Sequence, residues 1–168
     1  MNTIDKINKL SQSEFIEIFG NIFEKTEWIA KKLCEQKPFN NFEDLCSQML
    51  KIFVMADRES KLKIIRSHPD LADRLNINSL SKNSYSEQSD AGLDQCSEKE
   101  FEEFNNLNKK YKHKFGFPLI ISVKGKNKIE ILNEFKKRIL NSVDYEFNEA
   151  IIQVSKIANL RLNKINIK

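Results

Sequence analysis

Apolar side chains recur along most of this chain at intervals of three and four residues, the spacing that places them on one face of an α-helix. The first stripe consists of Phe15, Ile18, Phe19, Ile22 and Phe23. Candidate helix caps precede the stripes at Ser11 with Glu14, at Thr26, at Asn41, and at Ser97 with Glu100. Because the sequence has only four glycines and three prolines, we predict an all-α, single-domain bundle over residues 1–168, with about seven to eight helices.

One short apolar run has the composition of a β-strand. It consists of Leu119, Ile120, Ile121, Ser122 and Val123. No second strand is predicted, so we expect a buried extended segment near residues 119–123. Its backbone N–H and C=O groups then need partners, and a polar ligand could be one of them. Two helices, over roughly residues 127–141 and 144–164, are expected to complete the fold.

The charge and cysteine content excludes several classes of protein. The 28 basic and 24 acidic residues are interleaved, so no nucleic-acid-binding face is expected. The three cysteines, Cys34, Cys46 and Cys96, are expected to pack as small apolar side chains, because neither disulfide nor metal-ligand spacing is present. No apolar run has transmembrane length, and neither a secretory signal nor a C-terminal peroxisomal signal is recognisable. We therefore expect a cytoplasmic protein with no membrane partner.

The first candidate for chemistry is His68, one of only two histidines in the chain. Pro69 pushes His68 out of the helical region, and Pro69 and Asp70 are favourable residues for the first turn of a new helix. A histidine at such a junction can point its ring into a cleft. Glu87 and Gln88 follow in a polar, turn-rich stretch. An imidazole with a carboxylate and an amide from another segment is a candidate acid–base site.

Structural interpretations of the same residues stay open. His68 could be an N-cap-like residue before Pro69. Ser84 and Glu87 have the spacing of a capping box for a short helix through Ala91. The second histidine, His113, is expected to be an exposed helical residue.

A second candidate is Arg161, which interrupts the apolar stripe of the last helix. That stripe runs through Phe147, Ile151, Val154, Ala158, Arg161 and Ile165. A buried guanidinium group without an anionic partner costs several kcal/mol, so a partner is expected. The partner could be a substrate, or an Asp or Glu in a structural ion pair. The side chain could also extend to solvent at the helix end.

Several motifs in this order resemble the 2-oxo-4-hydroxy-4-carboxy-5-ureidoimidazoline (OHCU) decarboxylase family, which forms (S)-allantoin in urate degradation. The resemblance covers Phe15 to about Leu162. It rests on Phe19-Gly20, Phe23-Glu24, Trp28, His68-Pro69-Asp70-Leu71-Ala72, Ser84-x-x-Glu87-Gln88-x-x-Ala91-Gly92-Leu93, Leu107-Asn108-x-x-Tyr111, Lys114-Phe115-Gly116-Phe117-Pro118, Val123-x-Gly125, Arg138-x-x-Asn141 and Ile157-Ala158-x-x-Arg161-Leu162. At Leu119 the family commonly has phenylalanine.

The resemblance implies an all-α homodimer that acts on a small-molecule substrate without a metal or organic cofactor. His68 resembles the family's catalytic histidine, and Glu87 and Arg161 resemble its other essential polar residues. The regions that resemble its substrate contacts are Pro69, the segment Ser84, Tyr85, Ser86, Glu87 and Gln88, and the segment Leu119, Ile120, Ile121, Ser122 and Val123.

The implied chemistry suits these residue types. The substrate loses CO2 from a ring carbon beside a carbon–nitrogen double bond, and the product then needs a proton from one face, for which an imidazole is suited. His68 is the expected proton donor. Glu87 would hold the imidazole or substrate N–H groups, Gln88 the ureido group, and Arg161 a substrate oxygen. Two alternatives remain: a family member that acts on a related ureido or imidazoline acid, and a non-enzymatic helical binding module.

Overall fold

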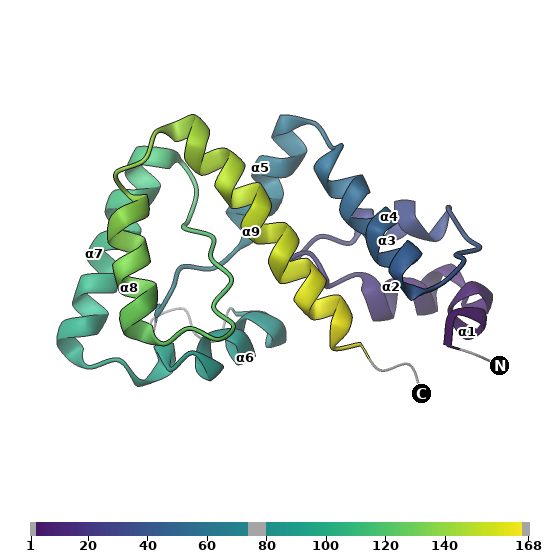
Figure 1. Ribbon diagram of the computed structural model, residues 1–168, viewed down its shortest axis with the longest axis horizontal. Coiled ribbons are helices and arrows are strands. Elements are labelled where there is room, and N and C mark those ends of the chain that lie inside the picture. Colours follow the sequence, from purple (N-terminus) through teal and green to yellow (C-terminus); the bar gives the residue numbers. More distant parts are fainter. Residues whose placement is uncertain (1–2, 74–79, 166–168) are drawn as a thin grey trace. The chain divides into compact units, whose positions relative to one another are not determined.

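The computed structural model describes residues 3–73 and 80–165, and within these ranges the chain is helical and contains no β-strand (Figure 1). Its elements are α1 (Thr3–Lys9), α2 (Gln12–Phe19), α3 (Trp28–Cys34), α4 (Phe42–Val54), α5 (Arg58–Ser67), α6 (Lys82–Asp90), the 3-10 turn η2 (Leu93–Gln95), α7 (Glu98–Phe115), α8 (Lys128–Arg138) and α9 (Val143–Asn163). The all-α prediction is confirmed, with nine α-helices in the described ranges. None of the helices in those ranges is long and apolar enough to cross a lipid bilayer.

Local sequence signals account for most helix starts. The capping boxes of Ser11 with Glu14 and of Ser97 with Glu100 are both formed, and the Asn41 side chain accepts a hydrogen bond from the first turn of α4. The prediction that Thr26 caps α3 is wrong. The helix begins at Trp28, and the Thr26 hydroxyl donates to the carbonyl of Glu24 instead. Thr26 lies one residue before the N-cap position, Glu27, and its hydroxyl bonds to the local backbone instead of to the first turn of α3.

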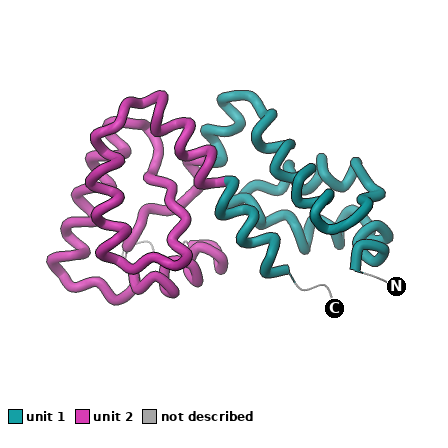
Figure 2. Tube along the Cα trace, in the orientation of Figure 1, with its two compact units in different colours: residues 1–64, 155–168 teal, residues 65–154 magenta. Residues whose placement is uncertain are grey.

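The chain divides into two compact units (Figure 2). Unit 1 comprises residues 1–64 and 155–168, and unit 2 comprises residues 65–154. Helix α9 contributes residues to both, so unit 1 consists of two sequence segments, whereas unit 2 is one continuous segment. The expectation of a single domain over the whole chain stays a prediction.

The core of unit 1 is formed by the apolar faces of α2, α3 and α4, as the helical spacing predicted. Phe15, Phe19 and Phe23 are fully buried, although α2 ends at Phe19. The Phe23 ring packs against Phe53 of α4, with 5.0 Å between ring centroids. Four of the five stripe residues are therefore in the core, including two beyond the end of the helix, while Ile18 is only partly buried.

The core of unit 2 lies between α7 and α8, which pack against each other (Figure 1). Tyr111 of α7 and Phe135 of α8 are fully buried, with ring centroids 5.7 Å apart. A left-handed Gly116 ends α7, and His113 in its last turn is exposed, as predicted. The three cysteines of the chain are buried and reduced, which confirms that they pack as small apolar side chains.

Candidate active site

His68 lies one residue beyond the end of α5, in unit 2. Its backbone N–H donates to the carbonyl of Ile65 at 3.2 Å and closes the last turn. Pro69 has no N–H with which to continue the helix. The prediction that Pro69 begins a new helix is wrong: residues 69–73 form a turn, in which Ala72 has a left-handed φ of 54°.

Side chains from two neighbouring helices explain why this turn does not continue as a helix. The Gln88 amide of α6 donates to the Asp70 carbonyl at 3.2 Å and accepts from the Ala72 N–H at 3.0 Å. The Asn108 amide of α7 donates to the Leu71 carbonyl at 2.9 Å. Backbone groups that a helix would pair internally are therefore satisfied from outside the turn.

A cavity of about 230 Å³ opens beside His68. It is lined by Arg66, His68, Pro69, Asp70, Asp73, Leu80, Lys112 and Pro118. Two of these lining residues, Lys112 and Asp70, form an ion pair at 2.6 Å, with both side chains partly exposed. His68 is half-buried, so its imidazole lies in a wall that a small solute can reach. Titratable groups of both signs around a small volume suit a polar substrate with both donors and acceptors.

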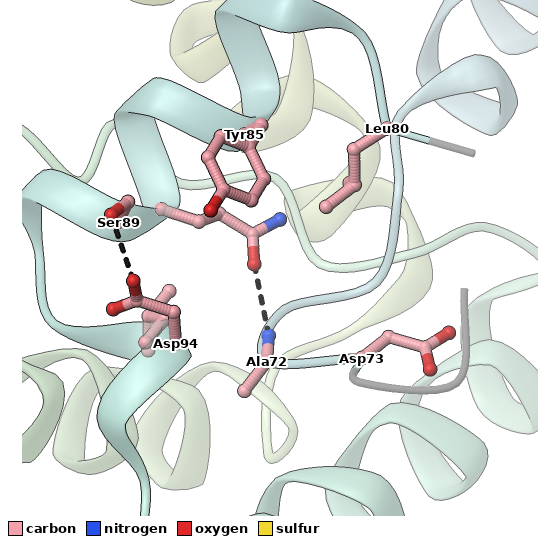
Figure 3. Close-up of a pocket in the computed structure, with 8 residues that line it drawn as sticks. Ala72, Asp73, Leu80, Tyr85, Ser89 and Asp94 are labelled. Atoms are coloured by element: carbon pink, nitrogen blue, oxygen red, sulfur yellow. Dashed lines mark hydrogen bonds between the residues drawn. The ribbon is translucent and has the colours of Figure 1, made fainter. Parts of the chain in front are cut away.

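A second cavity, of about 90 Å³, is lined in part by the same turn (Figure 3). It shares Asp73 and Leu80 with the first cavity, and its other lining residues are Ala72, Tyr85, Gln88, Ser89, Leu93 and Asp94. Figure 3 shows the hydrogen bond at the Ala72 N–H and the one from the Ser89 hydroxyl to Asp94, which measures 2.8 Å. The turn that follows His68 therefore contributes lining residues to both cavities.

Helix α6 carries the predicted substrate-contact segment 84–88. The proposed capping box at Ser84 is wrong: Ser81 caps α6, and its side chain accepts from the Ser84 N–H. Gln88 is buried and Tyr85 is half-exposed, and both line the second cavity. Neither set of lining residues includes Ser84, Ser86 or Glu87. Of these, Ser84 is buried, Ser86 exposed and Glu87 half-buried.

The apolar segment 119–123 is extended and largely buried, as predicted. It directly follows Pro118, which lines the first cavity. Two of its backbone groups have side-chain partners. The Ser122 N–H donates to the Gln153 side chain at 2.8 Å, and the Ile120 carbonyl accepts from Arg138 at 2.5 Å. Protein side chains thus satisfy groups for which the sequence left a ligand open as a partner.

Arg138 belongs to a buried polar network that we did not predict. Its guanidinium pairs with Glu146 at 2.8 Å, and Glu146 has no exposed surface. Glu146 also accepts from the Asn141 amide at 2.7 Å and from the Tyr111 hydroxyl. Burial, and next the hydrogen bond to Glu146, raise the pKa of Tyr111 above its ordinary value. A sequence signal was present: Ile131, Phe135 and Arg138 follow a helical apolar spacing, the pattern that drew attention to Arg161.

Arg161 lies in unit 1, where it is 4% exposed and thus at a core position, as its stripe predicted. It pairs with the buried Glu24 at 3.1 Å and donates to the Ile22 carbonyl at 3.3 Å. The structural ion pair that the sequence left open as an alternative is therefore present. A role for Arg161 in substrate binding stays a prediction.

In the described part of unit 2, a half-buried histidine thus stands in the wall of a small polar cavity on a helical scaffold. This arrangement suits an enzyme that moves a proton on a small polar substrate. The family model described as OHCU decarboxylase matches residues 8–163, and the chain belongs to this family.

Similar proteins agree with the family assignment. A 2-oxo-4-hydroxy-4-carboxy-5-ureidoimidazoline decarboxylase of Haloferax volcanii is 35% identical over 95% of this chain and 94% of its own length. A uric acid degradation bifunctional protein of a Bacillus species is 36% identical over 98% of this chain, which spans only 32% of that relative's length.

Solved structures also resemble the fold. A crystal structure of (S)-allantoin synthase superposes with a TM-score of 0.78 and 26% identity, covering 99% of this chain and 54% of the other. A crystal structure of an OHCU decarboxylase in the presence of (S)-allantoin has a TM-score of 0.68 and 26% identity, covering 82% of this chain and 89% of the other.

Proposed function

We propose that the protein decarboxylates OHCU to (S)-allantoin and CO2 in urate degradation, without a cofactor and with His68 as the proton donor. Family membership supports the reaction class, and the Haloferax volcanii relative that bears the name of this activity matches over nearly its full length. The observation that carries the proposal is the half-buried His68 in the wall of a small polar cavity.

The reaction needs little from the protein beyond binding and proton transfer. The bond between the carboxylate carbon and the ring carbon breaks, and its electron pair forms a double bond to the neighbouring carbon. The electrons of the carbon–nitrogen double bond move to the nitrogen, which takes up a proton. The resulting enol then becomes a ketone: the neighbouring carbon takes a proton while the hydroxyl loses its own. An imidazole, which ordinarily titrates near neutral pH, can donate the proton to carbon from one side of the ring, and that single-sided delivery makes the product chiral.

The other residues of α6 have binding roles in this proposal. Gln88 uses one amide N–H and one oxygen lone pair on the turn after His68, and an amide has one more of each for a ureido group. Glu87 would orient the imidazole or accept from substrate N–H groups. Tyr85 would form part of the wall of the second cavity, and Pro69 part of the wall of the cavity beside His68.

The test is circular dichroism of the product at an allantoin band, with substrate generated in situ from urate by urate oxidase and hydroxyisourate hydrolase. Wild-type protein should accumulate optically active (S)-allantoin. His68→Asn should lose it, with a rate decrease of about 100- to 10,000-fold, because the general acid is missing. The matched control is His113→Asn, which changes the exposed histidine of α7 and should retain the wild-type rate.

Racemic product at the uncatalysed rate from folded wild type would contradict the proposed reaction. Turnover of related ureido and imidazoline acids should then be compared, since Leu119 departs from the family pattern. Polyanion binding that depends on salt and not on His68 would favour a binding module instead.

Arg161 is proposed to be required for activity through binding of a substrate oxygen. Arg161→Lys keeps a positive charge beside Glu24 but loses the planar fork, so we expect a loss of activity of about tenfold or more, corresponding to about 1.4 kcal/mol or more. Unchanged kinetics together with a lower free energy of unfolding would restrict Arg161 to its structural ion pair.

Two further properties belong to the same proposal. The family resemblance supports a homodimer, and we also propose a cytoplasmic location, a reducing setting that fits the three reduced cysteines. Multi-angle light scattering after gel filtration should give twice the 19.7 kDa mass of the chain, and a monomeric mass at working concentration would contradict the first of these.

A further inference from the structure

The turn after His68 is held from two helices by side chains that contact consecutive backbone positions. Gln88 of α6 bonds to Asp70 and Ala72, and Asn108 of α7 bonds to Leu71 between them. Figure 3 shows the bond at Ala72. The three contacts measure 2.9 to 3.2 Å, and both amide side chains are buried.

The chain before His68 is also held. The Arg66 guanidinium donates to the Gly116 carbonyl at the end of α7, at 3.0 Å. Lys112 of α7 lies one helical turn after Asn108 and pairs with Asp70. Helix α7 and its C-cap therefore contact the chain on both sides of His68, and Asn108 supplies the buried contact to backbone.

Asn108 is a costly choice if its role is only to pack. The side chain is 5% exposed, and within the described residues its oxygen has no hydrogen-bond partner. An apolar side chain of similar size would fill the same volume without a buried unsatisfied acceptor. What an apolar side chain could not do is hold the Leu71 carbonyl.

We propose that Asn108 is a positioning residue for the reaction. Together with Gln88 it fixes the 70–72 turn, and through that turn it sets the place and direction of the His68 imidazole relative to the substrate. This inference rests on the proposed function and adds to it a residue on α7 that lines neither cavity.

The experiment compares Asn108→Leu with wild type by kinetics and by product stereochemistry. Loss of the contact should lower kcat by about 100-fold, because a small misplacement of a catalytic group has an effect of that order. KM should change little, because the donor acts in the chemical step. The enantiomeric excess of the allantoin should fall, since uncatalysed protonation then competes.

A second readout does not depend on activity. The chain has two histidines, so ¹⁵N-histidine labelling yields one imidazole of interest and one internal reference. In Asn108→Leu the His68 ring signals should shift or broaden, while those of His113 stay at their wild-type positions. The matched control is Asn106→Ala, which changes an exposed asparagine on the same helix and should alter neither kinetics nor spectrum.

A folded Asn108→Leu protein with wild-type kcat, wild-type enantiomeric excess and unshifted His68 signals would overturn the inference. If that variant does not fold, Asn108→Ala is measured in its place. Failure of both to fold would overturn it too, because Asn108 would then serve the fold alone. If wild type makes no (S)-allantoin, the proposed reaction fails, while the His68 spectra still report separately on whether Asn108 holds the turn.

Discussion

Two non-helical segments of unit 2 meet the same physical requirement in different ways. The 69–73 turn begins with Pro69 and the 119–123 segment follows Pro118, both lie after the end of a helix, and helices supply partners for the backbone of each. The turn is held by neutral amides and a partly exposed ion pair. The extended segment is held by Gln153 and by the fully buried network of Arg138 and Glu146.

The difference separates two uses of irregular backbone. The 69–73 turn lies against two cavities, so its neighbour His68 can meet a solute. The 119–123 segment keeps its apolar side chains in the core. Changes near the turn should therefore alter catalysis more than stability, and changes in the network of the extended segment should alter stability first.

The largest expected effect is that of Glu146→Gln on stability. The change leaves the buried Arg138 without its counter-charge, which costs about 3–5 kcal/mol in the free energy of unfolding. Denaturant titration measures this. Glu149→Gln on the same helix is the control: Glu149 accepts from Gln153, the amide can still accept there, and the expected change is within about 0.5 kcal/mol. Equal effects of the two variants on the free energy of unfolding would contradict the view that the buried network around the 119–123 segment serves stability.

Tyr111→Phe should have the next largest effect. It removes the hydroxyl donor to Glu146 and should lower the free energy of unfolding by about 1.5–3 kcal/mol, the range for a hydrogen bond to a charged group. Circular dichroism during denaturation measures it. A lower kcat, measured under conditions in which Tyr111→Phe is fully folded, would mean that this network also serves the reaction.

The pH dependence of stability should report on the same hydroxyl. Burial and the bond to Glu146 raise the pKa of Tyr111 above its ordinary value of 10.0. Above pH 10 the unfolded chain loses this proton while the folded chain keeps it, so Tyr111 makes stability decrease as pH rises. Melting temperatures between pH 8 and pH 11 should fall less steeply in Tyr111→Phe. Parallel pH profiles of the two proteins would show that Tyr111 does not titrate in this way.

The smallest expected effect is that of Lys112→Met on stability. Its ion pair with Asp70 is partly exposed, so the free energy of unfolding should change by less than about 1 kcal/mol. The control is Lys126→Met, which removes another partly exposed pair, with Glu134 on α8. Both variants should melt alike, but kcat/KM should fall in Lys112→Met only, because Lys112 lines the cavity beside His68. Equal kcat/KM values for the two variants would show that Lys112 has no role in the reaction.

Prediction from sequence succeeded where the interaction is local. The capping boxes at Ser11 and Ser97, and the buried stripes, involve residues a few positions apart. It failed at Pro69, where the expected helix does not form because Gln88 and Asn108 pair with the turn from elsewhere in the chain. It also did not predict that Arg138 is buried, although the spacing that identified Arg161 as a core arginine was present there too.

The sequence alone determined that this chain is all-α, many of the residues in its core, and which family it resembles, because helix periodicity, capping and motif order depend on short spacings. Only the tertiary structure decided that Glu24 pairs with Arg161, that Glu146 pairs with Arg138, and that two amide side chains fix the turn beside His68. The physical reason is that a buried charge or backbone group takes whichever partner the packed helices bring within about 3 Å, and in these cases most of those partners lie far away in the sequence.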